Sequence, residues 1–258
     1  MPETETRSET KTPKAQRTRE HILTTALALF AEKGYDETTM RDIAARADCS
    51  LGLAYRYFTR KEEFILALYE RCALELEEEV LRLPPGPLAK RFAQAMEADL
   101  RRMGENRGTM GALFAAGLAP NSEVAVLGEG VAGIRERTWG IFRVVVTGAS
   151  DAPRPKQAEQ ITTLFYAAHL LLVLFWLQDR SVGQAKTREL LSFAGEMIGR
   201  LRPVLGLPLV AKPLARLAQI VGPMFGPPET PPSAPPTEAR TNGPRDEEHG
   251  APESSHTA

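Results

Sequence analysis

Apolar residues recur with helical spacing along most of this chain, and this periodicity constrains the fold more than any other feature. The first apolar stripe runs from Ile22 to Phe30 and stops at Gly34, a typical helix end. A second stripe runs from Ile65 to Val80. Further helical patterns cover 88–103, 108–118, 122–147, 155–179 and 184–202, and residues 206–225 hold a possible extra short helix interrupted by prolines. Because strand patterns are almost absent, we expect an all-α fold.

Both ends of the chain differ from its middle. Residues 226–258 contain 8 prolines in 33 residues and no Val, Ile, Leu, Met, Cys or aromatic residue. Such a composition cannot bury enough apolar surface to offset chain entropy, so we expect this tail and residues 1–15 to be disordered. The tail carries a net charge of −4, and since the whole chain carries −1, residues 1–225 carry +3.

Cysteines and histidines are too few and too scattered to predict a metal centre. The two cysteines, Cys49 and Cys72, exclude a disulfide scaffold and a Cys-rich zinc site. Residues 1–20 are polar and lack the apolar run of a secretory signal, so we expect a cytoplasmic protein. No catalytic spacing of Ser, His and Asp or of paired carboxylates stands out. We therefore expect neither an enzyme nor a cofactor.

Residues 38–61 have the pattern of two short helices joined by a tight turn. Thr39 can cap the first helix. Ser50 can cap a second helix of about two turns, which ends at Tyr57 or Phe58. Two short helices after a longer supporting helix predict a helix-turn-helix.

The residues between and after these helices fit the same arrangement. Asp48 lies in the break and tolerates the left-handed conformation that a tight turn requires. Thr59-Arg60-Lys61-Glu62 has the spacing of a capping box, which predicts the start of a long helix over about 60–82.

The same segment is locally basic. Residues 38–61 carry a net charge of +3, from Arg41, Arg46, Arg56, Arg60 and Lys61 against Asp42 and Asp48. Nucleic-acid phosphates favour such a surface, and hydroxyl groups add hydrogen bonds to phosphate oxygens. Leu51, Gly52 and Leu53 are small enough to let the second helix approach base edges in the major groove.

Two stretches resemble the N-terminal domain of the TetR (tetracycline-repressor) family of regulators: F-A-E-K-G-Y-D-E-T-T-M-R-D-I-A and S-L-G-L-A-Y-R-Y-F-T-R-K-E-E-F. The resemblance covers about residues 17–70. It implies a DNA-binding domain over 16–62, and a helical ligand-binding and dimerisation domain over 63–205. The chain departs from the family at Asp48 and Cys49, where Gly-Val is common, and at Tyr57, where His is common.

By position, the resemblance implies which side chains meet double-stranded operator DNA. The base-facing candidates are Arg41, Leu51, Gly52, Leu53 and Arg56. The phosphate-contacting candidates are Thr39, Tyr55, Tyr57 and Lys61.

A nucleotide-binding enzyme is one alternative, because Gly128, Gly130 and Gly133 form a G-x-G-x-x-G motif between two valine-rich stretches. Against it, one helical face continues through both supposed strands and the loop. That face consists of Val124, Leu127, Val131, Ile134, Thr138, Ile141 and Val145. We therefore favour a helix here.

A membrane-tethered regulator is a second alternative, because residues 161–177 contain no charge. The run is shorter than the roughly 20 residues of a membrane span. A helix that is apolar all round also suits an interface. The resemblance to the TetR family places such a helix near this position, paired with 184–202. We therefore expect a homodimer formed through about 155–202, with no membrane contact.

Apolar and aromatic side chains of the central helices can line a pocket for a small-molecule effector, which we expect to be largely apolar. The pocket candidates are Met96, Met103, Met110, Phe114, Trp139, Phe142, Tyr166 and His169. For His169 we favour a hydrogen-bonded core or interface histidine over a ligand contact. Taken together, the sequence predicts a ligand-released repressor that binds a palindromic operator as a homodimer.

Overall fold

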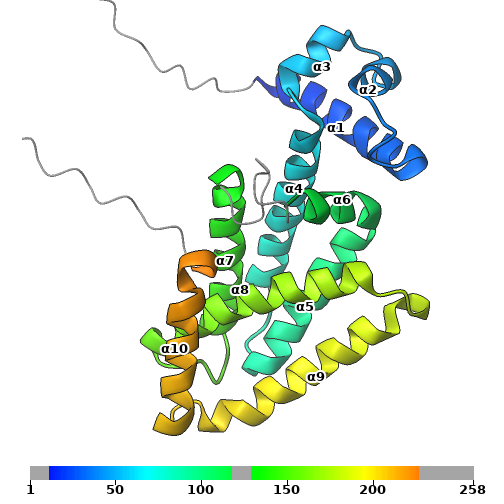
Figure 1. Ribbon diagram of the computed structural model, residues 1–258. Helices are drawn as coiled ribbons and strands as arrows, with labels where there is room; N and C mark the ends of the chain where they lie inside the picture. Colours follow the sequence, from blue (N-terminus) through cyan, green and yellow to red (C-terminus); the bar gives the residue numbers. More distant parts are fainter. Residues whose placement is uncertain (1–11, 118–128, 227–258) are drawn as a thin grey trace, which may run out of the picture. The chain divides into compact units, whose positions relative to one another are not determined.

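The computed structural model describes residues 12–117 and 129–226, and within them the regular structure is helical (Figure 1). The helices are α1 (Pro13–Lys33), α2 (Met40–Arg46), α3 (Leu51–Tyr57), α4 (Lys61–Leu81), α5 (Leu88–Gly104), α6 (Arg107–Gly117), α7 (Ala132–Thr147), α8 (Pro155–Gln178), α9 (Ala185–Leu201) and α10 (Pro208–Phe225). Among the described residues there is no strand, and an isolated bridge joins Gly86 to Ala149. The all-α prediction is confirmed.

The helix α1 begins earlier than the sequence predicted. Thr12 caps it, since its side chain accepts a hydrogen bond from the amide of Ala15, and Pro13 occupies the first helical position. Proline is well suited there because the missing N–H would have no helical partner anyway. Residues 13–15 are therefore helical, and the rest of the expected arm, residues 1–11, lies outside the described residues, as does the tail from residue 227 onwards.

Helices α1, α2 and α3 form a small head, and α4 runs from it into the helical body (Figure 1). Gly34 ends α1 at φ 89°, a value that side chains rarely tolerate. The buried side chains of α1, α2 and α3 join one apolar core with Phe64 and Ile65 of α4. The boundary expected at residues 62 and 63 remains a prediction, because α4 belongs to both parts.

The start of α4 differs from the predicted capping box in the partner of Thr59. Thr59 bonds to Glu63 and not to Glu62: its amide donates to a Glu63 carboxylate oxygen at 2.9 Å, and its hydroxyl bonds to the other oxygen. The helix begins at Lys61, so Glu63 lies at the third helical position, where a carboxylate reaches back to the free amide groups of the first turn.

In the body, α4 packs on α5 and α7, α7 packs on α8, and α5 packs on α9. The sequence predicted one helix over 122–147. Within the described part of that range, the structure has a short turn of 3-10 helix at Glu129–Val131 followed by α7. Residues 118–128 lie outside the described residues. Gly130 and Gly133 therefore stand at the start of a helix with no described strand beside them, which speaks against a nucleotide-binding unit.

The helix α10 corrects the expectation of a short, interrupted helix, because it spans 18 residues. Pro213 follows the first turn, and Pro223 lies in the last turn. A proline at these places removes hydrogen bonds only near the helix ends. Packing on α8, including a ring contact of Phe225 with Tyr166 at 6.3 Å, adds stabilisation that the sequence pattern could not reveal.

Candidate nucleic-acid interface

Side-chain caps hold α2 and α3 in place, as the sequence predicted. Thr39 and Asp42 form a reciprocal capping box at the start of α2, and the Ser50 side chain accepts a hydrogen bond from the amide of Leu53 at 3.1 Å. Between the helices Asp48 adopts φ 49°, the left-handed conformation expected of it. These local contacts fix the orientation of α3 relative to α2 within the head.

The helix α3 has one buried and one exposed side. Ala54 and the following Phe58 are buried, and the Phe58 ring stacks on that of Phe64 of α4, with ring centres 4.0 Å apart. Tyr55 is 45% exposed, and Arg56 and Gly52 are exposed. A methyl group built on Gly52 would meet no atom within 4 Å, so the surface there is open.

The other α3 candidates are less accessible. Leu51, Leu53 and Tyr57 are half-buried, and Leu51 and Tyr57 pack partly against the core of the head. The structure therefore brings Arg41, Gly52, Tyr55 and Arg56 to the surface, whereas Leu51, Leu53 and Tyr57 divide their surface between core and solvent.

The cations of the head fall into two groups. Arg46 pairs with Glu32 of α1 at 2.5 Å, and Lys33 pairs with Asp42 at 3.5 Å. By contrast, Arg41 and Arg56 have no ion pair or side-chain hydrogen bond with the described residues. An unpaired guanidinium keeps its five donors available for phosphate or guanine.

Lys61 is engaged in the described structure. Its ammonium donates to the carbonyl oxygen of Tyr35 at 2.7 Å and of Asp36 at 3.2 Å, and it lies 4.3 Å from the centre of the Tyr35 ring. Burial raises the pKa of Tyr35 well above its ordinary value. The lysine thus ties the start of α4 to the loop after α1 and still lies at the edge of the head.

Thr39 also has a structural role. Its amide and hydroxyl both donate to Asp42, at 2.9 and 2.8 Å, and these hydrogen bonds lower the pKa of the Asp42 carboxyl. The residue is nevertheless exposed, so a phosphate oxygen can reach it.

All eight pocket candidates are buried, from 0% to 8% exposed. The structure brings Phe142, Tyr166 and His169 together, with ring centres 5.2 Å apart for Phe142 and His169 and 6.0 Å apart for Tyr166 and His169. Trp139 donates its indole N–H to the Thr163 hydroxyl at 3.3 Å. Three hollows of ≈ 570, ≈ 460 and ≈ 260 Å³ beside α9 are lined by other side chains.

Sequence reasoning missed the partner of His169. Asp99 of α5 places its Oδ2 atom 3.1 Å from His169 Nδ1, and both side chains are almost fully buried. The Nε2 atom of His169 has no hydrogen-bond partner among the described residues. Asp99 lies on the apolar face of α5 with Leu88, Phe92 and Met96, and a charged residue at such a position was the overlooked signal.

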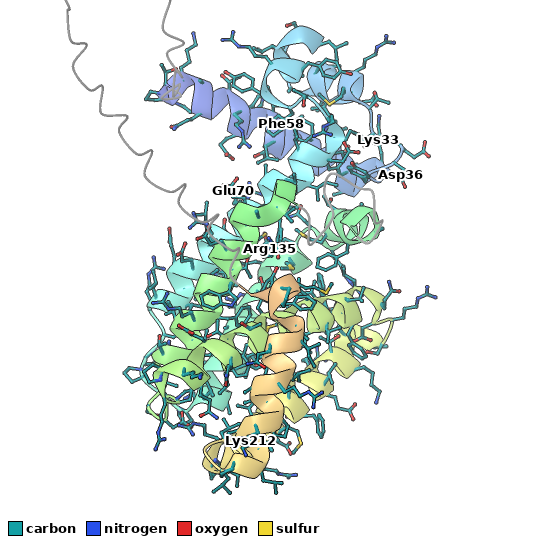
Figure 2. All side chains as sticks on the ribbon, turned by 60° about the vertical axis from the view of Figure 1, so that its left-hand side comes forward. Lys33, Asp36, Phe58, Glu70, Arg135 and Lys212 are labelled. Carbon is teal, nitrogen blue, oxygen red and sulfur yellow. The ribbon has the colours of Figure 1, made fainter. Side chains whose placement is uncertain are left out.

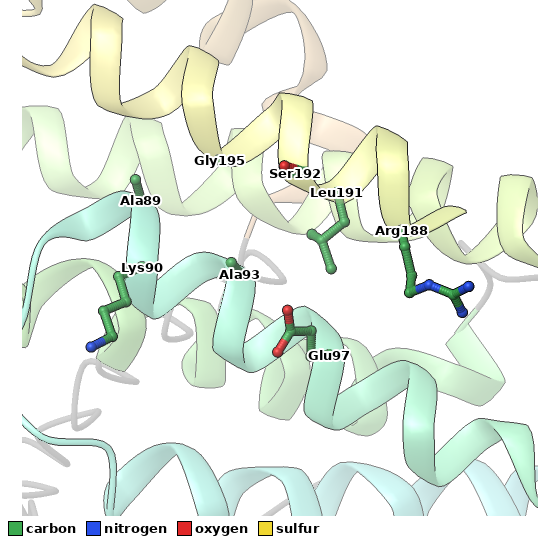
Figure 3. A pocket seen from close by; sticks show the side chains of 8 residues that line it. All are labelled: Ala89, Lys90, Ala93, Glu97, Arg188, Leu191, Ser192 and Gly195. Atoms are coloured by element: carbon green, nitrogen blue, oxygen red, sulfur yellow. The ribbon is translucent and has the colours of Figure 1, made fainter. Parts of the chain in front are cut away.

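Of the three hollows beside α9, the two larger ones lie against α8 and α5. An apolar groove of ≈ 570 Å³ lies between α8 and α9, with Phe165, Leu171 and Phe193 among its lining residues. A second hollow of ≈ 460 Å³ lies between α5 and α9. Figure 3 shows Lys90 near one end, Arg188 near the other, and Glu97 and Leu191 between them, so the two basic groups do not converge on one point.

The apolar helix α8 is long and apolar enough to cross a membrane by length and composition, and 56% of its most apolar window is buried in the fold. Core helices of folded domains have the same character. Within the described residues, no group of three or more His, Cys, Asp or Glu side chains is placed to hold a metal ion.

Comparison with known proteins agrees with this architecture. Residues 22–68 match the model of the bacterial regulatory proteins of the tetR family, and residues 91–202 match the model of a tetracyclin repressor-like C-terminal domain. Together the two matches cover more than half of the chain.

Individual proteins are similar over shorter or more distant stretches. The regulator TcmR of Streptomyces glaucescens is 34% identical over 128 residues, which are 44% of this chain and 55% of TcmR. The chain spans about half the length, or less, of the curated relatives it matches.

Solved structures share the fold. A tetR-family regulator from Streptomyces coelicolor superposes with a TM-score of 0.56 at 22% identity, covering 82% of this chain and 92% of that one. FadR of Bacillus subtilis, crystallised with stearoyl-CoA, gives a TM-score of 0.50 at 16% identity, covering 68% of this chain and 96% of that one. With both family models matched in order on a fold of the same kind, the chain belongs to the TetR family of bacterial regulatory proteins.

Proposed function

We propose that this protein is a cytoplasmic repressor that binds a palindromic DNA operator as a homodimer and leaves it when a small-molecule effector binds. The observation that carries the proposal is the surface of the head. There Arg41 and Arg56 are exposed and lack acidic partners among the described residues, beside the open surface at Gly52. A short helix presented in this way fits the major groove.

The surface of α8 and α9 supports a dimer. Leu171 is 68% exposed, Phe175 41% and Phe193 56%, and all three line the apolar groove between the helices. Exposed apolar patches of this kind mark interaction sites. A two-fold dimer then presents two α3 helices to half-sites about one helical turn apart, roughly 34–36 Å.

The effector would enter the body among the buried candidates from Met96 to His169. FadR, which shares this fold, binds stearoyl-CoA, and this supports an effector with a large apolar part. The helix α4 provides the connection, because Phe64 stacks on Phe58 below α3 while Tyr69 and Cys72 pack into the body core. The effector releases DNA only if it binds better to the arrangement in which the two heads are wrongly spaced.

The direct test is to incubate the full chain with sheared genomic DNA of its own host and to sequence the retained fragments. We expect a palindromic sequence that binds two chains per duplex, with an affinity that falls steeply with salt. The proposal is overturned if no fragment is retained above a salt-matched background, or if one chain saturates the site.

A further inference from the structure

The helix α10 carries an exposed apolar stripe that its own fold does not use. Leu209 is 86% exposed, Leu217 48%, Ile220 66% and Met224 50%. At about 100° per residue these four side chains fall within an arc of roughly 80°. Lys212, Arg216 and Gln219 lie beside this arc, and Figure 2 shows Lys212 at the end of the molecule remote from the head.

A different face of α10 holds the helix on the body. Ala218 is buried, Val210, Leu214 and Phe225 pack against the core, and Phe225 contacts Tyr166 of α8. Since these contacts already fix α10 on α8, burial of the exposed stripe needs another surface.

The stripe borders the apolar groove between α8 and α9. Leu214 of α10 and the preceding Leu205 both line that groove. Leu201 at the end of α9 and Leu207 at the start of α10 are 48% and 54% exposed. Apolar surface is therefore continuous from the face proposed for the dimer onto α10.

The exposed area suits a second copy of the chain. The four stripe residues expose on the order of 450 Å², and Leu171, Phe175, Phe193 and Leu201 expose a similar amount. The sum is comparable to the roughly 800 Å² per partner of a standard protein interface. Neither surface alone reaches that size.

We infer that α10 completes the dimer interface, with a second copy covering Leu209, Leu217, Ile220 and Met224. The inference rests on the proposed homodimer and adds an element that lies beyond residues 91–202, where the match to the family C-terminal domain ends. Lys212 and Gln219 are exposed beside the stripe and lie outside the surface that the second copy covers, and α10 contains no acidic residue.

Sedimentation equilibrium of the full chain tests this inference. We expect the double substitution Leu217→Gln, Ile220→Gln to raise the dimer dissociation constant about 30-fold or more. The matched control Lys212→Gln, Gln219→Ala on the polar arc should change it less than 3-fold. Phe193→Gln on α9 should weaken the dimer independently of α10.

The outcomes separate the two proposals. If Phe193→Gln weakens the dimer and the α10 pair does not, the inference is overturned while the homodimer stands. If the wild-type chain is monomeric at all concentrations, the homodimer itself is overturned. If the α10 pair instead abolishes sedimentation with phosphatidylglycerol vesicles and leaves the dimer intact, the stripe meets a membrane and the inference fails.

Hydrogen exchange of the unmodified chain gives an independent measurement, which does not depend on variants that fold. Amide protection in 208–225 should rise with protein concentration in parallel with protection in 185–201. Concentration-independent exchange in α10 alone would overturn the inference.

Discussion

Two arginines of the head (α1–α3) and two of the body (α4–α10) are used in opposite ways. In the body, Arg91 is 3% exposed and donates to four carbonyl oxygens, and Arg107 donates to three carbonyls at the end of α8. In the head, Arg41 and Arg56 are exposed and keep their donors unused by the described residues.

The difference separates structural charge from functional charge. A guanidinium that satisfies orphan carbonyls stabilises helix ends and contributes little field outside the protein. An unpaired guanidinium on an exposed helix adds little to the stability of the fold. Its positive charge is instead available to attract the phosphates of DNA. Net charge alone, at −1 for the whole chain, conceals this division.

Removing the most enclosed arginine should have the largest effect. Arg91→Met leaves the carbonyls of Leu83, Pro84, Val144 and Val145 without their charged donor. We expect a loss of about 4 kcal/mol in the free energy of unfolding, measured by urea denaturation.

Arg143→Met is the matched control for Arg91→Met. Arg143 is exposed and forms no side-chain hydrogen bond with the described residues, so its loss should change stability by less than about 0.5 kcal/mol. Equal losses for the two variants would contradict the structural role of Arg91.

The second prediction concerns DNA affinity and compares three arginines of the head. Arg41→Gln and Arg56→Gln should each weaken operator binding by roughly 1–3 kcal/mol, or about 5- to 150-fold. Arg46→Gln removes the same formal charge but breaks the pair with Glu32, so it should cost less than about 3-fold.

Fluorescence anisotropy on the selected operator, with stability checked for each variant, measures these affinities. If all three substitutions weaken binding equally, the affinity depends on the total positive charge of the head. The distinction between paired and unpaired arginines would then be wrong.

Local features of the head could be predicted from the sequence because they depend on residues a few positions apart. The caps at Thr39 and Ser50 and the left-handed Asp48 each follow from short-range backbone chemistry. The burial of Phe58 follows similarly, since its spacing places it on the inner face.

Long-range pairings could not be predicted. Lys61 binds carbonyl groups 25 and 26 residues earlier, and Asp99 lies beside His169, 70 positions later in the sequence. Which helices meet depends on packing, and periodicity shows only the face that a helix buries. The length of α10 was missed for the same reason, because its contacts with α8 compensate for prolines that favour a break.

A smaller effect is expected from the cap of α3. Ser50→Ala removes the acceptor for the amide of Leu53 and should cost about 1 kcal/mol of stability, whereas Ser50→Gly should cost only a few tenths. Thermal unfolding monitored by circular dichroism measures both. A larger loss for glycine than for alanine would show that the backbone conformation, and not the cap, decides the result.

The smallest predicted effect compares two carboxylates that cap helices, one in each region. Asp179, before α9, accepts four hydrogen bonds from Ser181 and Thr187, at 2.6 to 2.9 Å, and these bonds lower its pKa below the ordinary value. Asp42 in the head accepts hydrogen bonds from Thr39, which also lower its pKa. A carboxyl whose pKa is lower in the folded state stabilises the fold above its unfolded pKa of about 4, and this stabilisation is lost as pH falls towards the folded value.

Both carboxylates should therefore contribute to a fall in the urea midpoint below about pH 4, and Asp179 should contribute more because it accepts more hydrogen bonds and is only 8% exposed. Asp179→Asn should flatten the dependence of the midpoint between pH 4 and 2, and Asp42→Asn should flatten it less. At pH 7 both variants should be less stable than the wild type, since the amide cannot reproduce the charged acceptor. An unchanged acid profile in Asp179→Asn would show that the hydrogen bonds to the Asp179 carboxylate do not stabilise the fold.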